Sequence, residues 1–308
     1  MAPFVEQLLA GCAAASQGAD LVLCWPWNRV GPSLAEALGV PVVIVSVNPA
    51  LHLPTRAFPN PFQGPPPLPL GPIYNRLTWL WGLPFARVSQ AQVERWRRET
   101  LGLGPLSWRG ELRQLRRLPH LFGFSPLVLP KPPDWGRSVH VTGYWFLDAP
   151  QSYQPPAELE AFLAAGPRPV AIGFSSQVGR NAGQVTETVL EALRRSGQRG
   201  ILVSGWGGLK GIDLPAGVFP IASVPYGWLF PRIAAMVHHG GAASTADTLR
   251  AGLPALAIPF GYEQGLWGRR IAQLGVAARP IPAARLTPEA LARGVARISG
   301  DEGMRERA

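Results

Sequence analysis

The chain has 308 residues, 47% of them hydrophobic and 16% charged, and this balance excludes an intrinsically disordered protein. Its formal net charge of +10 suits an anionic partner, but it contains neither a dense Lys/Arg block nor a nucleic-acid-binding motif, so we expect no nucleic-acid partner. No apolar run reaches the ~18 residues of a membrane span, and the first residues lack the basic region of a signal peptide, so we expect a cytoplasmic protein.

Along the first half of the chain, helix-like and strand-like segments alternate. We expect a helix near 3–15, a strand at 20–24, a helix near 30–38 and a strand at 41–45. The two strand segments are continuous apolar runs, and such runs are typical of strands that are buried on both faces of a parallel sheet.

A proline-rich segment, residues 49–72, separates these elements from a long helical pattern over about 73–100. Such a segment is too long for a plain connector and is typical of a functional loop. Trp79, Trp81 and Trp96 fall in the helical pattern, where they either form helix core or line an apolar cleft. The basic and aromatic stretch RLTWLWGLPFAR is compatible with peripheral contact with a membrane surface.

The second half begins with a linker-like segment at 148–168 that contains one short helix, and the alternation becomes regular from Pro169. Apolar runs predict its strands, and the segments between them predict its helices. The expected strands are 169–174, 201–203, 217–222, 234–238 and 255–259, and the expected helices are 184–195, 244–251, 263–274 and 288–298. Repeated units of strand and helix predict an α/β protein with a doubly wound parallel sheet.

Several polar or glycine-rich loops of this half follow the expected strands directly. They contain Ser175 and Ser176, then residues 205–208, 239–245 and 260–264. The carboxyl ends of parallel strands meet at one edge of a sheet, and ligands bind there. The four loops therefore predict a ligand site at that edge.

The segment VHHGGAAST, residues 237–245, is expected to form a strand end, a glycine turn and a helix start. Such a turn points backbone N–H groups at whatever lies above the helix, and anions favour that position. A diphosphate there would meet these N–H groups, the Ser244 hydroxyl and the His239 imidazole. Alternatively, Ser244 is only an N-cap and the histidines are satisfied strand-end residues. Asp247, one turn later, would hold ribose hydroxyls or simply favour the start of the helix.

Glu263 and Gln264 follow the last expected strand and a short turn. A carboxylate beside an amide offers both acceptors and donors to a polyhydroxylated ligand. The alternative interpretation is helix capping.

The second half resembles the donor-binding signature of nucleotide-sugar-dependent glycosyltransferases with the GT-B fold, over residues 224–276, VPYGWLFPRIAAMVHHGGAASTADTLRAGLPALAIPFGYEQGLWGRRIAQLGV. It is most similar to the bacterial and fungal sterol glucosyltransferase branch, to which residues 199–208 and LPTRAFPNPF, residues 53–62, are also similar. The resemblance implies two Rossmann-like doubly wound domains, the first of them incomplete. Their expected bounds are 1–150 for a partial N-terminal acceptor-binding domain, 151–168 for a linker and 169–308 for a nucleotide-sugar donor-binding domain.

The resemblance implies a role for each matching position. The donor diphosphate would be held by His239, Gly241, Ala242, Ala243, Ser244 and Ser176. The sugar hydroxyls would be held by Glu263 and Gln264, and the nucleoside would lie against Trp206, Val224, Tyr226 and Asp247. The chain departs from the family pattern at four positions, since the family prefers Gly for Ser175 and Ala243, Asp for Glu263 and His for Tyr226.

The implied activity is that of a hexosyltransferase that moves a hexose from a UDP-sugar, or another NDP-sugar, to a hydroxyl of a sterol-like or other lipophilic acceptor, with inversion. We expect no metal and no cofactor, because N–H groups would hold the leaving diphosphate and no D-x-D triplet occurs. The catalytic residue is not identified, since the family's glycine-rich start and its N-terminal catalytic histidine have no counterpart among His52, His120 and His140. We interpret His52 as an ordinary loop histidine and expect the chain to be truncated at both ends.

A second hypothesis is a catalytically incomplete nucleotide-sugar-binding remnant, or a subunit that needs a partner polypeptide to supply missing N-terminal strands. A dinucleotide oxidoreductase is a third, but no G-x-G-x-x-G follows an expected strand. Under the leading hypothesis the partners are a nucleotide-sugar donor and a lipophilic small-molecule acceptor. The location is then the cytoplasm, with peripheral contact at a membrane.

Overall fold

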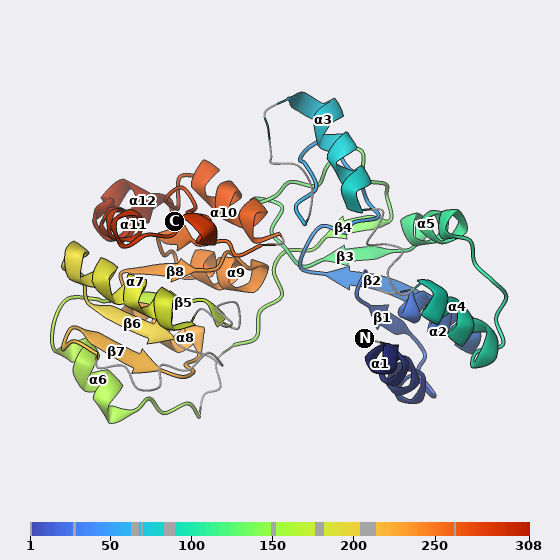
Figure 1. The fold of residues 1–308 in the computed structure, drawn as a ribbon, viewed down its shortest axis with the longest axis horizontal. Coiled ribbons are helices and arrows are strands. Elements are labelled where there is room, and N and C mark those ends of the chain that lie inside the picture. Colours follow the sequence, from blue (N-terminus) through green and yellow to red (C-terminus); the bar gives the residue numbers. More distant parts are fainter. Residues whose placement is uncertain are drawn as a thin grey trace. The chain divides into compact units, whose positions relative to one another are not determined.

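The computed structural model describes residues 2–26, 29–62, 68, 70–82, 90–148, 152–175, 182–203, 214–261 and 263–308. The chain forms two compact units, Met1–Tyr144 and Trp145–Ala308 (Figure 1). Both are built from parallel strands and helices, so the predicted α/β class is confirmed.

In the first unit, four short parallel strands form one sheet in the order β1-β2-β3-β4. These strands are β1 (Val22–Cys24), β2 (Val42–Ser46), β3 (His120–Phe122) and β4 (Val139–Val141). The helices are α1 (Ala2–Ala15), α2 (Val30–Leu38), α3 (Gly71–Thr78), the 3₁₀ turn η1 (Trp79–Gly82), α4 (Gln90–Glu99) and α5 (Trp108–Arg117). Leu9 of α1, Leu34 of α2 and Trp96 of α4 share one buried cluster, which holds these three helices together.

The prediction of one long helix over 73–100 is wrong. Helix α3 ends at Thr78, the chain tightens into η1, and α4 begins only at Gln90, while residues 83–89 lie outside the described part. Gly82 has a low helix propensity, and 3₁₀ turns are common where a helix ends. Trp79 and Trp96 are buried, whereas Trp81 is exposed.

The sequence patterns also miss α5, β3 and β4. Strands β3 (HLF) and β4 (VHV) each contain a histidine, so neither lies in a continuous apolar run. Strand β3 moreover begins with His120, a polar residue that is fully buried.

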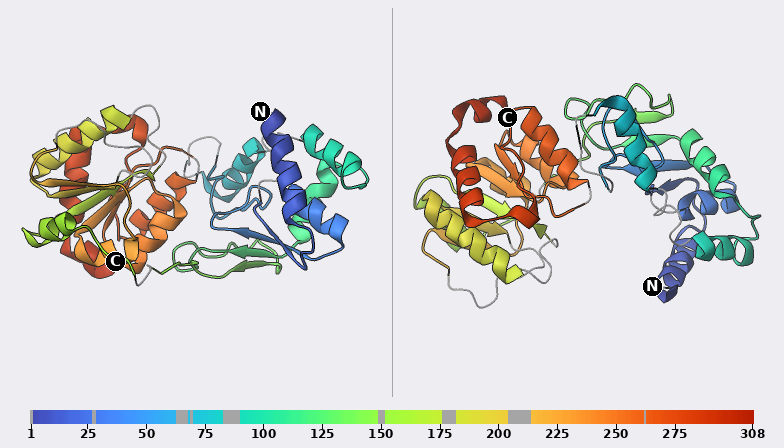
Figure 2. Two further views of the ribbon diagram at one scale, coloured as in Figure 1. Left: turned by 90° about the horizontal axis from the view of Figure 1, so that it is seen from below. Right: turned by 45° about the horizontal axis from the view of Figure 1, so that its top comes forward.

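In the second unit, five parallel strands form a sheet in the order β7-β6-β5-β8-β9. Helices lie on both faces of this sheet (Figures 1 and 2). These strands are β5 (Val170–Gly173), β6 (Gly200–Val203), β7 (Val218–Ile221), β8 (Ala235–His238) and β9 (Ala255–Ala257). The helices are α6 (Ala157–Ala164), α7 (Ala182–Ser196), α8 (Tyr226–Leu229), η5 (Phe230–Arg232), α9 (Ala242–Arg250), α10 (Gln264–Gln273), η6 (Ala283–Arg285), α11 (Pro288–Gly300) and α12 (Glu302–Arg307).

Both faces of this sheet are covered, so the predicted doubly wound arrangement is confirmed. Ile172 packs with Leu193 of α7 and Val295 of α11 in the cluster on one face. Ala171, its neighbour along β5, packs with Leu159 and Leu229 on the other face. Alternate residues of a buried parallel strand point to opposite faces, which is why the strand reads as a continuous apolar run.

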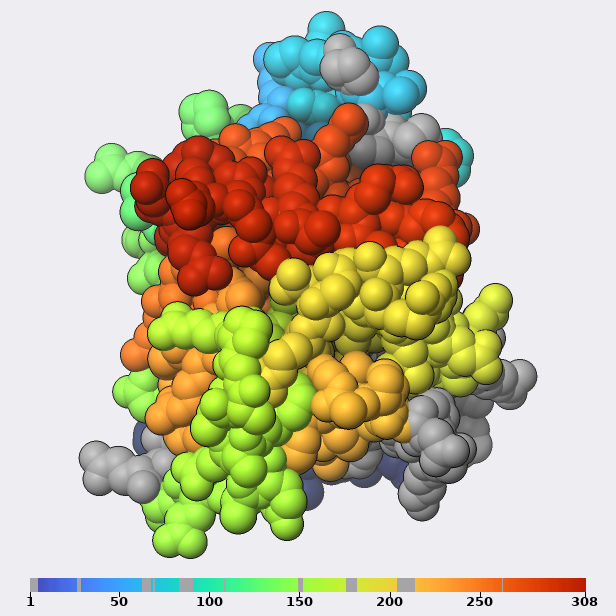
Figure 3. All heavy atoms as spheres, turned by 90° about the vertical axis from the view of Figure 1, so that its left-hand side faces the viewer, coloured from blue at the N-terminus to red at the C-terminus, as the bar shows by residue number. Residues whose placement is uncertain are grey.

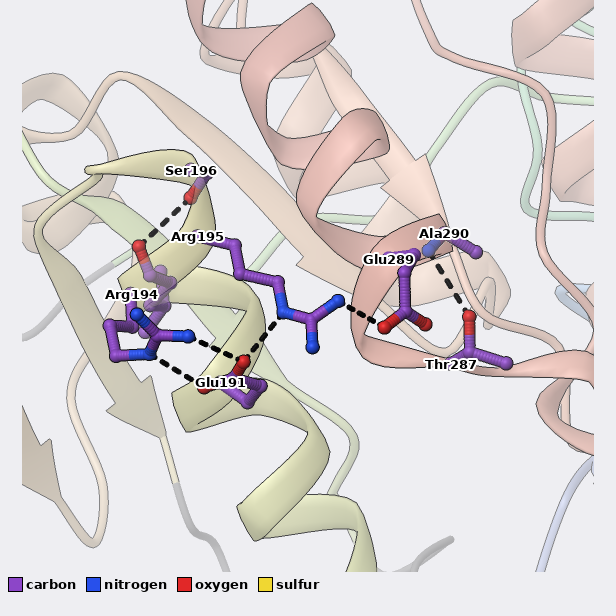
Figure 4. A network of polar contacts seen from close by, with 8 residues as sticks. Glu191, Arg194, Arg195, Ser196, Thr287, Glu289 and Ala290 are labelled. Carbon is purple, nitrogen blue, oxygen red and sulfur yellow. Dashed lines mark hydrogen bonds and ion pairs between the residues drawn. The ribbon is translucent and has the colours of Figure 1, made fainter.

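Helices α7 and α11 lie side by side across one face of the second unit (Figure 3). An exposed network of charged side chains joins them (Figure 4): Glu191 accepts from Arg194 Nε at 2.7 Å and from Arg195 Nε at 2.6 Å, and Arg195 also pairs with Glu289 at the start of α11. Exposed pairs of this kind contribute little free energy, so the apolar cluster beneath holds the helices together. Among the described residues, no helix combines the length and apolarity needed to cross a bilayer.

Candidate functional site

The order of the strands in the second unit changes direction at one point along the sheet, between β5 and β8. Strands β5, β6 and β7 follow one another in one direction across the sheet, and β8 and β9 lie on the other side of β5. The direction therefore reverses between β5 and β8, where Gly173 pairs in register with His238. Ligands of doubly wound sheets bind outside the carboxyl ends of the strands at such a switch point.

Helix α9 begins next to this point, directly after the turn that follows β8. Gly241 is its N-cap with φ of −66°, and glycine has no side chain that could cap the helix. Ser244 is the third helical residue, so the alternative in which Ser244 caps α9 is wrong. The first-turn N–H groups of a helix have no intrahelical acceptor and carry a partial positive charge, so this end suits an anion.

The side chain of His239 lies across this helix end. A Cβ atom at Gly241 would lie only 2.3 Å from Nε2 of His239, so glycine is what lets the imidazole approach the backbone. Burial lowers the pKa of His239 below its usual range, so the ring is neutral at pH 7. Its buried Nδ1 has no hydrogen-bond partner among the described residues.

The neighbouring His238 shapes the turn from inside the sheet. It is fully buried, and its Nδ1 accepts a hydrogen bond from the N–H of Gly240 at 3.1 Å. Burial is the main cause that lowers the pKa of His238 to about 3, with His239 adding a smaller effect. The prediction of a satisfied strand-end histidine therefore holds for Nδ1 of His238 but not for its Nε2, which has no partner in the described part of the chain.

Gly240 brings a second loop against the turn. Its φ is +85°, a left-handed conformation that favours glycine, and a Cβ atom there would lie 2.8 Å from the backbone oxygen of Gln264. The turn after β8 and the start of α10 are thus in contact. This contact places Glu263 and Gln264 beside the His239 turn, as the convergence of loops predicted.

Glu263 and Gln264 differ in their surroundings. Gln264 is buried, and its Oε1 accepts a hydrogen bond from the N–H of Phe260 at 2.8 Å, which closes the loop between β9 and α10. Glu263 is half-buried at the N-cap of α10, but its side chain does not cap the helix. The capping alternative is therefore wrong for Glu263, and its role toward a ligand stays a prediction.

Ser175, at the end of β5, has a backbone that suits glycine. Its φ of +53° makes it the one described residue other than glycine in the left-handed region. Glycine is what the family resemblance expects at this position. Ser176 lies outside the described residues, so its predicted contact with a diphosphate stays a prediction.

Two of the four residues that were predicted to contact a nucleoside line the same cavity. Tyr226 and Asp247 line one cavity of about 310 Å³, and burial raises the pKa of both side chains, with the Asp247 charge adding to the shift of Tyr226. Val224 is buried in the core cluster, and Trp206 lies outside the described residues. The sequence reasoning missed Arg250, which lines the same cavity; its spacing of three from Asp247 on one helix was the available signal.

The first unit holds the remaining histidines. His52 and His120 are buried, and their Nε2 atoms lie 2.7 Å apart, while Nδ1 of His120 bonds to the carbonyl oxygen of Leu118 at 2.8 Å. Burial is the main cause that lowers the pKa of His52 to about 3. His140 is exposed on β4. His52 is therefore a partnered core residue of a loop.

Known proteins resemble the chain along most of its length. The profile of the family "Erythromycin biosynthesis protein CIII-like, C-terminal domain" matches residues 208–308. The chain is 40% identical to the O-mycaminosyltylonolide 6-deoxyallosyltransferase of Streptomyces fradiae, with 98% of this chain and 70% of that protein covered. It is 36% identical to a sterol 3-beta-glucosyltransferase of Cryptococcus neoformans, with 97% of this chain and 20% of that protein covered. It is also 36% identical to the sterol 3-beta-glucosyltransferase UGT80A2 of Arabidopsis thaliana, with 92% and 45% covered.

The chain thus spans between a fifth and a half of the length of these sterol 3-beta-glucosyltransferases. Solved structures share its fold. The glycotransferase of kitacinnamycin superposes with a TM-score of 0.70 at 18% identity, covering 97% of this chain and 73% of that one. The glycosyltransferase VinC, solved in complex with dTDP, superposes with a TM-score of 0.61 at 18% identity, covering 97% and 69%.

Proposed function

The chain belongs to the family 1 glycosyltransferases of the GT-B fold, and from this membership we propose that it moves a hexose from a UDP-sugar, or another NDP-sugar, to a hydroxyl of a sterol-like or other lipophilic acceptor, with inversion. The relatives reported above are all named as transferases, so a catalytically incomplete binding remnant is not favoured. The names of the sterol 3-beta-glucosyltransferases support a lipophilic acceptor, and the name of the Streptomyces enzyme supports a sugar other than glucose as an alternative donor.

One observation carries the proposal: the uncapped start of α9, with the imidazole of His239 lying over Gly241, at the switch point of the sheet. A donor diphosphate in this place would accept hydrogen bonds from first-turn N–H groups of α9 and from His239. The Ser244 hydroxyl, within the first turn, would add a further donor. Asp247 and Tyr226, on the cavity flanking α9, would then meet the nucleoside, and Glu263 the sugar.

In the proposed reaction the acceptor oxygen attacks the anomeric carbon of the sugar, and the bond from that carbon to the diphosphate oxygen breaks. Negative charge grows on the leaving diphosphate, where the α9 N–H groups and His239 stabilise it. The acceptor proton must pass to a base. His52 and His120 do not suit this role, because each is buried and hydrogen-bonded to the other.

Isothermal titration of the whole chain with UDP, UDP-glucose and dTDP tests the donor site. We expect binding by the wild-type protein and a loss of roughly 10-fold or more in affinity in His239→Ala, because a hydrogen bond to a charged group is removed. His140→Ala, which removes an exposed histidine of the first unit, is the matched control and should bind like the wild type. A folded wild-type chain that binds none of the three nucleotides would contradict the donor site.

A second assay tests transfer itself. The chain is incubated with UDP-glucose and a sterol, and the product is isolated and its anomeric configuration read by NMR. A β-glucoside from the α-configured donor would support inversion. Retention of configuration, or nucleotide binding without any product over a panel of lipophilic alcohols, would contradict the proposed reaction.

A further inference from the structure

Helix α3 and the turn η1 are fixed to the first unit by polar contacts. The Oγ1 of Thr78 accepts a hydrogen bond from the N–H of Asn60 at 2.7 Å, and the indole N–H of Trp79 donates to the carbonyl oxygen of Phe58 at 3.2 Å. Thr78 and Trp79 are both almost completely buried. The side of these elements that faces the protein therefore has its polar groups satisfied, and the segment is held in one orientation.

The remaining side is apolar and more than half exposed, and part of it lines a cavity against the rest of the unit. Its large side chains follow a spacing of three or four residues, which places them along one face, and between 54% and 72% of each is exposed. We call this row the α3 ridge; its members are Leu70, Ile73, Leu77, Leu80 and Trp81. Single exposed apolar residues are ordinary, but a contiguous row on a projecting element marks an interaction surface (Figure 1).

Basic side chains border the ridge. A cavity of about 300 Å³ is lined by Ile73, Leu77 and Leu80 of the ridge together with three arginines, Arg56, Arg76 and Arg116. Arg116 also donates a hydrogen bond from Nε to the carbonyl oxygen of His52 at 3.1 Å. Asp134 lies 3.8 Å from Arg76 and also accepts a hydrogen bond from the Arg56 backbone, so it offsets part of this charge. The surface thus joins leucine and isoleucine side chains to a positive rim.

We propose that the α3 ridge docks on the surface of an anionic lipid bilayer. Its apolar side chains enter the boundary of the acyl chains, and the arginine rim lies at the level of the lipid phosphates. Interfacial helices bind membranes through this combination of apolar area and cationic side chains, and each surface Arg adds to the attraction of anionic lipid. A second copy of the chain is a poorer partner, since the net charge of +10 would repel it. The proposal is independent of the glycosyl transfer proposed above.

Sedimentation with vesicles tests this docking on the whole chain. We expect binding to phosphatidylcholine vesicles that contain phosphatidylglycerol, much weaker binding to phosphatidylcholine alone, and a decrease as salt is raised. The double variant Leu77→Ser with Leu80→Ser should lower the partition coefficient by roughly 10-fold or more, because two buried leucine side chains are lost from the interface. Leu127→Ser is the matched control: it removes a leucine of the same unit that is 84% exposed and lies outside the ridge.

The arginine rim is tested separately, so that the proposal stays open to refutation if the serine variants fold poorly. Arg56→Gln should lower binding to the anionic vesicles by roughly 5-fold, while Arg95→Gln, on the exposed side of α4, should leave it unchanged. Equal binding of all folded variants would overturn the proposal, and so would equal binding to both kinds of vesicle. Self-association of the wild type that the double serine variant abolishes would overturn it too, by assigning the ridge to a second copy.

Discussion

Two histidine sites show how differently the two units use the same side chain. In the first unit, His52 and His120 bond to each other at 2.7 Å, and the second nitrogen of His120 bonds to a backbone carbonyl. In the second unit, His239 lies over Gly241 at the start of a helix, and its buried Nδ1 has no partner among the described residues. A pair that is satisfied within the fold contributes to stability, whereas the half-buried ring of His239 keeps part of its surface open to a ligand.

The glycines around His239 explain why the second arrangement persists. Gly240 lets the turn adopt its left-handed backbone and touch α10, and Gly241 leaves room for the ring. The variants below separate these contributions, and the first unit supplies the contrast in which a histidine matters for stability alone.

The largest effect is expected for Gly240→Ala. The new Cβ atom would carry both the strain of φ at +85° and a clash at 2.8 Å with the backbone oxygen of Gln264. Together these should lower the free energy of unfolding of the second unit by about 3 kcal/mol, measured by calorimetry. Gly197→Ala is the matched control, because its φ is +64° but no atom lies within 4 Å of the added Cβ, so about 1 kcal/mol is expected. Equal losses in the two variants would contradict a tight contact between the two loops.

The next effect concerns the pair in the first unit. His52→Leu leaves Nε2 of His120 buried without its partner and should cost about 2 kcal/mol at pH 7, without changing nucleotide affinity. His239→Ala should do the reverse, weakening binding with little loss of stability. A His52→Leu protein as stable as the wild type would mean that the pair contributes nothing to the fold.

The pH dependence of stability tests the role of His52 in the first unit. Burial holds the pKa of His52 at about 3 in the folded chain, against 6.5 for an ordinary histidine. Below pH 6.5 the unfolded chain therefore takes up a proton that the folded chain does not, and stability falls as the pH falls from 6.5 toward 3. Calorimetry between about pH 7.5 and 5 should show that the free energy of unfolding decreases as the pH falls. The part of this decrease that is due to His52 approaches about 1.4 kcal/mol per pH unit. The decrease should therefore be smaller in His52→Leu. Parallel pH profiles for the two proteins would contradict a buried neutral His52.

The contrast also explains what could be predicted from the sequence. In the second unit the strands lie in continuous apolar runs that are followed by polar or glycine residues, so patterns within ten residues locate the sheet and its edge. Strand β8, predicted at 234–238, spans Ala235–His238. Helix starts were less exact, since α7 and α9 both begin two residues before their predicted starts. For α9 the reason is that Gly241 can serve as N-cap and that Ala242 and Ala243 are strong helix formers.

In the first unit the decisive contacts are distant in the chain. Strand β3 holds a buried histidine whose partner lies 68 residues earlier, and no local pattern predicts such a pair. The contact between Gly240 and Gln264 is hidden in the same way, although both residues lie in recognised motifs. Motifs therefore located the loops of the candidate site in the sequence. The direct contact between the loop after β8 and the start of α10 could be seen only in the folded structure.

A smaller effect isolates the position of the His239 ring. Gly241 has φ of −66°, which alanine adopts without strain, so the main effect of Gly241→Ala is to displace the His239 ring, whose Nε2 would otherwise lie 2.3 Å from the new Cβ. Nucleotide affinity should fall roughly 10-fold, while the loss of glycine at the N-cap should lower the free energy of unfolding by only about 1 kcal/mol. In a His239→Ala background the same substitution should have little effect, because the ring it displaces is gone. Additive losses in the double variant would show that Gly241 acts on binding independently of His239.

The smallest effect is expected at Ser175, where β5 ends beside the His239 turn. A serine with φ of +53° is strained relative to glycine, and the gain from relieving that strain exceeds the extra entropy that glycine has in the unfolded chain. Ser175→Gly should therefore stabilise the second unit by at most about 1 kcal/mol, or roughly 2–4 °C in Tm. Ser175→Ala keeps the strain while removing the hydroxyl, so it should give no gain. A lower Tm for the glycine variant would show that the hydroxyl of Ser175 stabilises the loop more than its backbone strains it, and the edge beside β5 would then depend on a side-chain contact rather than on backbone shape.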